Sequence, residues 1–230
     1  MNTFFTEFLF SGMTISLIAY FAGMFLQKKT GLSFLNPLLI AIILVVILLV
    51  STGTSYESYY SSARYISFFL TPATVALAIP LYEKRELLVK HWKAVLAGIF
   101  TGVFSSLLII LLLSKVFSFT HEEYVTFLPK SITTAIGMEV SRSLGGYTAL
   151  TAICIIVTGI FGAVIAVPLF KVLHITHPIA KGIGLGAAAH AIGTSKAMEL
   201  GETEGAMSSL ALSVCGVVTV IAVNLFVNFI

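Results

Sequence analysis

A short polar stretch, residues 128–146, interrupts the apolar segments in the middle of the chain. Its one lysine, Lys130, is followed closely by three hydroxyl residues: Ser131, Thr133 and Thr134. Pro129 precedes the lysine, and proline favours the first position of a helix, where backbone N–H groups lack partners. An ammonium, hydroxyls and free N–H groups at a helix start can together bind an anion. We therefore predict that this stretch forms half of an anion-binding site.

A second candidate is His190, which lies in a run of alanine and glycine with almost no side-chain bulk. No other residue of this run is ionisable before Lys196. An imidazole can bind a carboxylate or take up the proton of a symported acid, so we predict a role in the site. Gly193, Thr194 and Ser195 then predict a helix break with exposed amides. The competing interpretation is a neutral imidazole bonded to a neighbouring carbonyl.

Other polar residues have two interpretations each. A first-half counterpart of the site is expected at Thr71, Pro72 and Thr74, and a simple proline kink is the alternative there. Lys130 itself could instead reach the membrane interface from a helix start, and hydroxyls often bond their own preceding turn. Glu139 and Arg142 stand three positions apart on one helix face, so they are expected to form a structural ion pair rather than to bind substrate.

The composition indicates the kind of protein that must position these residues. The chain is 58% apolar and 10% charged, with a mean hydropathy of +1.04, whereas soluble domains are ~45–50% apolar and ~25% charged. We therefore predict an all-α integral membrane protein, with residues 1–230 as a single membrane domain. Because a helical crossing needs ~20 apolar residues, the chain has room for about seven or eight membrane segments.

The apolar segments divide into continuous and interrupted ones. Continuous crossings are expected at residues 8–26, 34–50, 94–114, 147–170 and 206–230. Interrupted segments are expected at residues 66–82, where Pro72 and Pro80 disfavour regular helix, and at residues 182–195. Lys28 and Lys29 follow the first crossing, which places that end in the cytoplasm and the N-terminus outside. The net charge of +3 reflects this orientation and gives no reason to expect nucleic acid as a partner.

The same order of segments occurs twice, which predicts two structural repeats at about residues 1–120 and 121–230. His190 follows Pro72 by 118 positions, and paired interruptions of this kind indicate a midplane site in transporters. If residues 128–146 cross the membrane, the repeats are parallel; if they re-enter, the repeats are inverted. Counting lysine and arginine does not decide between the two. We favour the re-entrant, inverted arrangement, because irregular backbone at membrane depth is tolerated where it lines a cavity.

Four segments give the chain a resemblance to a known family: residues 71–82, residues 128–134, Thr158-Gly159 with Gly162-Ala163, and residues 189–194. In these segments the chain resembles the LrgB/CidB family of antiholin-like membrane proteins, and the resemblance extends over nearly its whole length. Ala135 stands where a proline is expected in that family.

The resemblance implies a function. Bacterial members are usually encoded beside a small holin-like partner and were first discussed as regulators of murein hydrolase export and lysis. A similar plant plastid protein carries glycolate and glycerate, and some bacterial relatives are linked to pyruvate uptake. The implied function is a carrier of small monocarboxylates in the bacterial inner membrane, with elevator-like alternating access as the expected mechanism. The alternative is a regulatory membrane partner of a holin-like protein that transports nothing.

Other function classes find no support in the sequence. It contains no nucleophile and base pair, metal-ligand cluster or phosphate loop, so we expect no enzyme, no cofactor and no metal. Cys154 and Cys215 are expected to be buried thiols. The expected partners are the carboxylate, the bilayer, a possible holin-like protein and a second copy of the chain. We expect a homodimer through the glycine-bearing crossings, because so small a chain has few helices that can stay fixed while others move.

Overall fold

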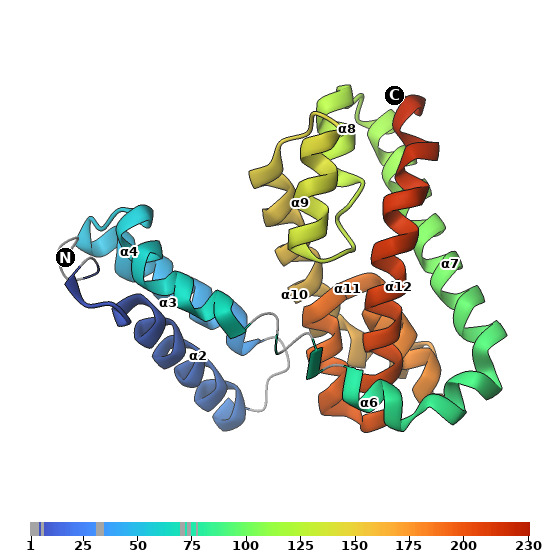
Figure 1. The fold of residues 1–230 in the computed structure, drawn as a ribbon, viewed down its shortest axis with the longest axis horizontal. Coiled ribbons are helices and arrows are strands. Elements are labelled where there is room, and N and C mark those ends of the chain that lie inside the picture. The colour runs from blue at the N-terminus through green and yellow to red at the C-terminus, as the bar shows by residue number, and fades with distance from the viewer. Residues whose placement is uncertain (1–4, 6, 31–34, 70–71, 73–74, 77) are drawn as a thin grey trace. The chain divides into compact units, whose positions relative to one another are not determined.

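The computed structural model describes residues 5, 7–30, 35–69, 72, 75–76 and 78–230. These residues form helices and contain no strand, which confirms the predicted all-α class. They divide into two compact units, Met1–Ala76 and Leu77–Ile230 (Figure 1). Each unit is described by itself, and the division of the chain into two repeats near Thr120 stays a prediction.

The first unit consists of α2 (Ser11–Thr30), α3 (Pro37–Thr52), α4 (Tyr56–Ala63) and the 3₁₀ helix η1 (Arg64–Phe69). The start of α3 is set by Asn36, whose side chain accepts hydrogen bonds from the N–H groups of Leu38 and Leu39 at 2.9 and 3.3 Å. Its end is set by Gly53, which adopts the left-handed conformation (φ 61°) that glycine tolerates best. Because both ends are capped, the apolar residues between them form one regular helix.

The second unit consists of α6 (Ala78–Glu83), α7 (Arg85–Val116), α8 (His121–Phe127), α9 (Thr134–Ser143), α10 (Thr148–Val172), α11 (Pro178–Leu200), α12 (Glu202–Phe226) and η2 (Val227–Phe229). Among the described residues, three helices are long and apolar enough to cross a bilayer: α7, α10, and α12 continued to Phe229. They cover three of the expected continuous crossings. The total of seven or eight membrane segments stays a prediction.

A short helical hairpin connects α7 to α10. It consists of α8, a turn and α9, which lie side by side in Figure 1. Its two ends are close together, because the Tyr147 hydroxyl at the start of α10 donates to Glu122 at the start of α8 (3.0 Å). Its turn reaches the middle of α7, where the Ser131 and Ser106 hydroxyl oxygens lie 3.1 Å apart. Residues 121–143 therefore form a hairpin, and re-entry of residues 128–146 into the membrane stays a prediction.

The helix start expected at Pro129 is wrong. Residues 128–132 form turns, and α9 begins only at Thr134, after Thr133 in an extended conformation (φ −64°, ψ 146°). The Pro129 carbonyl accepts a hydrogen bond from the N–H of Ile132 (3.3 Å), which closes a tight turn in place of a helical turn. Lys130 and Ser131 therefore stand at the tip of the hairpin rather than in the first turn of a helix.

α11 is a second hairpin. Its backbone leaves the helical region at Ala189 and His190, and His190 has φ 42° and ψ −133°. The two arms meet, since a Cβ placed on Gly193 would lie 2.7 Å from the Cβ of Ala189. Both ends of α11 lie near the start of α7, because the His177 and His91 rings are 6.3 Å apart and Lys84 bonds Glu202. The interruption predicted at His190 is present, and it reverses the chain. The helix break predicted at Gly193, Thr194 and Ser195 is wrong, because these three residues are helical.

Glycines bring the helices of this unit close together. A Cβ on Gly182 would lie 2.8 Å from the Cβ of Met207 in α12, and one on Gly102 would lie 3.2 Å from the Cβ of Ala187 in α11. Small residues of this kind let membrane helices approach closely. These glycines pack within one chain, and a homodimer through the glycine-bearing crossings stays a prediction.

The hydrogen bond between Tyr147 and Glu122 provides a test of the first hairpin. It stabilises the neutral phenol and raises the pKa of Tyr147, so its contribution is complete below the unfolded tyrosine pKa of about 10 and is lost as pH rises through the higher folded pKa. We expect Tyr147→Phe to weaken hydrogen-exchange protection slightly at the start of α10 at neutral pH, and to remove the further loss at alkaline pH. Equal protection in both proteins at neutral pH would contradict a stabilising contact.

Candidate functional site

The tip of the first hairpin presents one cation between α7 and α10. The ammonium of Lys130 donates to the Ser131 hydroxyl at 3.1 Å, and that hydroxyl also contacts Ser106. In the part of the chain that the structure describes, no carboxylate lies within ion-pair distance of Lys130. Lys130 is partly buried, so its charge is left without a protein counter-ion.

Lys130 and Ser131 line a cavity of about 450 Å³. Its walls come from four elements, and the lining residues of α7, α10 and α11 are mostly small or apolar. The polar lining is confined to the lysine and four hydroxyl residues: Lys130, Ser131, Ser105, Ser106 and Thr158. A pocket with an apolar wall and a few convergent polar groups is the usual form of a small-molecule site. One ammonium with several hydroxyls suits a small anion that carries a further oxygen.

The second hairpin reaches the same cavity with small residues. Ala187 and Ala188, just before the break in α11, line it together with Gly162 of α10. A Cβ on Gly162 would lie 2.7 Å from the Cβ of Ala189, so the tip of α11 rests directly on α10. The two hairpins, which enter the unit from opposite ends, therefore meet at one cavity.

His190 is bonded to a backbone carbonyl, as the competing interpretation of this residue expects. Its side chain is buried at 3% exposure, and Nε2 lies 2.8 Å from the carbonyl oxygen of Ile155. A carbonyl only accepts hydrogen bonds, so Nε2 is the donor. The ring packs against Gly159, where an added Cβ would lie 2.6 Å from Nε2. His190 does not line the cavity at Lys130, which separates two residues that the sequence assigned to one site.

A model of the LrgB-like family matches residues 16–229, nearly the whole chain. The chain belongs to the LrgB-like family. No solved structure matches it. The match extends from α2 to η2, so both hairpins and the cavity lie inside the part of this LrgB-like protein that the family shares.

The hydroxyls predicted beside Lys130 and His190 occupy three different places. Thr133 and Thr134 stand at the start of α9 and do not line the cavity. Thr194 is buried, where its hydroxyl donates to the His190 carbonyl at 3.0 Å and lies 2.9 Å from the Ser208 hydroxyl. Ser195 is exposed and donates to the carbonyl of Ala191. Of the predicted site residues, the cavity therefore brings together Lys130 and Ser131.

The first-half counterpart is described only in part. Thr71 and Thr74 lie outside the described residues, and Pro72 is exposed. Gly193, in the second half, lies at the contact between the two arms of α11, so its lack of a side chain is used for packing.

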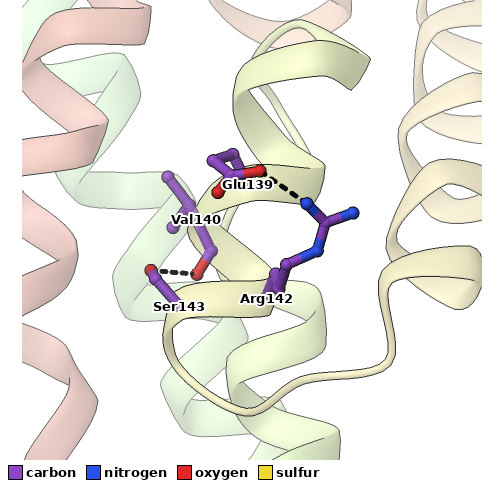
Figure 2. Close-up of polar contacts among 4 residues, drawn as sticks. All are labelled: Glu139, Val140, Arg142 and Ser143. Atoms are coloured by element: carbon purple, nitrogen blue, oxygen red, sulfur yellow. Dashed lines mark hydrogen bonds and ion pairs between the residues drawn. The ribbon is translucent and has the colours of Figure 1, made fainter.

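Glu139 and Arg142 form an ion pair on α9, with Nη1 and Oε2 2.9 Å apart (Figure 2). Both side chains are exposed, at 71% and 63%. Exposed pairs of this kind stabilise a fold by only ~0–1 kcal/mol. Figure 2 also shows the Ser143 hydroxyl donating to the Val140 carbonyl, so the last turn of α9 satisfies its own polar groups.

The sequence interpretation missed the hydroxyls that α7 and α10 contribute to the cavity of this LrgB-like protein: Ser105, Ser106 and Thr158. A signal for the first two was present, since Gly98, Gly102 and Ser105 or Ser106 recur at helical spacing in an otherwise apolar crossing. That pattern marks one small, partly polar face. The hairpin tip that lies against this face comes many residues later in the chain, so the sequence does not show that the two are in contact.

Proposed function

We propose that this LrgB-like protein is a carrier for small monocarboxylates and that the cavity at Lys130 binds the carboxylate. The observation that supports this most directly is the Lys130 ammonium, which faces a cavity and lacks an ion-pair partner among the described residues. A carboxylate in the cavity would neutralise this charge. The Ser131 hydroxyl, already bonded to the ammonium, would help to orient it.

The depth of the site favours transport. Ser106 lies ten residues before Val116, the last residue of α7, which is about 15 Å at the helical rise of 1.5 Å per residue. The apolar core of a bilayer is about 30 Å thick, so the tip of the hairpin reaches the middle of the crossing. An ammonium at that depth costs about 2.5–3.5 kcal/mol on insertion scales. Many secondary transporters bind their substrates at mid-depth, between interrupted helices of this kind.

The polar lining fits the substrate class. A 2-oxo or 2-hydroxy acid has one oxygen beside its carboxylate, and the hydroxyls of Ser105, Ser106 and Thr158 are available on the cavity wall to hydrogen-bond it. The volume of about 450 Å³ falls in the usual range for small-ligand pockets. Pyruvate, glycolate and glycerate all belong to this class, and we propose them as the substrates to test.

The proposal includes the cellular setting. We place the carrier in the bacterial inner membrane as a homodimer with its N-terminus outside, and we propose that one bundle moves against another in an elevator-like cycle. The alternative, a regulatory partner of a holin-like protein, would need surfaces for association but no cavity with a cation at mid-depth. The cavity therefore favours the carrier.

Uptake into proteoliposomes tests the proposal. Purified protein is reconstituted, and labelled pyruvate, glycolate and glycerate are supplied outside, with internal unlabelled substrate so that exchange is detected without a coupling ion. We expect saturable uptake of at least one of the three above protein-free vesicles. Absence of uptake of all three, together with stable co-purification with a holin-like protein, would support the regulatory alternative instead.

Replacement of Ser131 by alanine should weaken the site without emptying it. The variant removes a hydroxyl that contacts both Lys130 and Ser106, and a hydrogen bond to a charged group contributes about 1.5–3 kcal/mol. We expect the apparent affinity for the carboxylate to fall by about tenfold or more, measured as the Michaelis constant for uptake. Ser143→Ala, in the last turn of α9 away from the cavity, should leave it unchanged.

A further inference from the structure

A second pocket of about 470 Å³ adjoins the Lys130 cavity. The two share three lining residues, Gly98, Ile183 and Gly184, so they meet between α7 and the first arm of α11. The second pocket extends from there to His91 and His177 at the start of each helix. Together the pockets run from the hairpin tips to the end of the unit where the basic segment at residues 84–93 begins α7.

Two facing stripes of residues form the walls of this groove. The stripe on α7 is His91, Ala94, Gly98, Gly102 and Ser105, and the stripe on α11 is His177, Ala180, Gly184 and Ala187. Within each stripe the spacing is three or four residues, so each follows one face of its helix. The side chains between the two ends are small, and a histidine from each helix stands at the open end.

The side chain of Ile183 packs against α7 where the pockets meet. A Cβ on Gly98 would lie 3.2 Å from that side chain, so α7 has no room for a larger residue at position 98. Gly184 differs, because a Cβ added there would meet no atom within 4 Å. The bare backbone of Gly184 therefore faces the open space that joins the two pockets.

We infer that the groove is the path by which the carboxylate moves between the Lys130 cavity and the end marked by His91 and His177, and that the bare backbone of Gly184, which is exposed and lines both pockets, keeps this path open. The inference rests on the proposed function. A side chain at position 184 would stand in the groove where the anion passes. His91 and His177 offer imidazole N–H donors to the carboxylate at the open end.

Replacement of Gly184 by leucine tests the inference. Helical glycine is a poor helix former and an added Cβ here meets nothing, so the variant should fold. We expect its uptake to fall by about tenfold or more, because the leucine side chain would occupy the groove that joins the two pockets. Equilibrium binding is measured on the same protein, and a blocked path predicts a loss of uptake larger than any loss of affinity. Ala191→Leu is the matched control, because Ala191 is exposed just after the break in α11 and lines neither pocket.

A second variant keeps the inference testable if the leucine protein does not fold. Gly184→Cys is purified and reconstituted, and the thiol is then modified with methyl methanethiosulfonate, which adds bulk after folding. We expect modification to reduce uptake, dithiothreitol to restore it, and pyruvate to slow the modification. Wild-type protein treated with the same reagent controls for Cys154 and Cys215.

The possible results distinguish failure of the proposed path from failure of the proposed carrier function. Wild-type uptake by Gly184→Leu or by the modified cysteine variant, in a protein that transports normally, would overturn the path and leave the carrier intact. Absence of uptake by unmodified wild-type protein would instead overturn the carrier and, with it, the path. A loss of uptake in Ala191→Leu equal to that in Gly184→Leu would also count against a specific passage at Gly184.

Discussion

Replacement of Lys130 by alanine is expected to lower carboxylate uptake by about a hundredfold or more. Removing one partner of a buried ion pair costs about 3–5 kcal/mol, and each 1.4 kcal/mol is about a factor of ten in affinity. The protein should remain inserted and monodisperse, because among the described residues Ser131 is the one side chain bonded to the ammonium, and it keeps its contact with Ser106. Uptake and substrate binding are measured on the same preparation.

Two further variants test whether the loss of uptake is specific to Lys130. Lys115→Ala removes an exposed ammonium from the last turn of α7 and should transport normally, which controls for net charge. Lys130→Arg keeps the charge but substitutes a larger, planar group, so it should transport poorly if the cavity is shaped for a compact ammonium. Normal uptake by Lys130→Ala would remove this lysine from the site.

The first hairpin shows how far sequence reasoning reaches. A lysine, hydroxyls and a proline expected to start a helix predicted a polar stretch for an anion, and the structure places Lys130 at the tip of a hairpin, on the wall of a cavity. The prediction failed on local geometry, since Pro129 closes a turn and does not start a helix. Proline is compatible with both conformations, and the choice depends on how the stretch packs against α7.

The remaining cavity residues depend on tertiary contacts. Ser105 donates to the carbonyl of Gly102 in its own helix at 3.1 Å, which is the usual behaviour of a serine in a membrane helix. Its sequence context therefore resembles that of any helix-bonded serine. Only the approach of the hairpin tip and of Thr158 from α10 makes this face part of a cavity.

His190 shows the opposite error. The sequence contained an ionisable group in an alanine and glycine run, and the structure places it at the tip of α11, buried against α10. Gly159 makes room for the imidazole, and it precedes His190 by 31 positions. In the sequence, Thr158-Gly159 stands out only through the family resemblance, and the sequence does not tell which side chain packs against Gly159.

This packing predicts that His190 and Gly159 are coupled in stability. Gly159→Ala alone should destabilise the protein by about 1–3 kcal/mol, because the new Cβ would lie 2.6 Å from the imidazole and the ring must move. The movement would also lengthen or break the hydrogen bond from Nε2 to the Ile155 carbonyl. An unsatisfied buried donor costs a further ~1–3 kcal/mol. His190→Ala alone should cost about 2–4 kcal/mol through the lost bond and the space left behind.

In the double variant the two costs should not add. With His190 already alanine, the Cβ at position 159 enters the space that the ring has left, so Gly159→Ala should be nearly neutral and the coupling free energy should be about 1–3 kcal/mol. The free energy of unfolding is measured by denaturation of all four proteins in the same detergent. Gly216→Ala is the control, because its Cβ would lie 3.4 Å from Ile136, an ordinary contact, and should add independently to either substitution.

The same four proteins separate a packing role of His190 from a binding role. A ring that only packs between α10 and α11 leaves the cavity at Lys130 unchanged, so His190→Ala should keep its affinity for the carboxylate per folded protein. A ring that binds substrate would lose affinity in His190→Ala whatever residue stands at position 159. If the changes in the free energy of unfolding are additive, or if the stable double variant selectively loses affinity for the carboxylate, then His190 binds substrate.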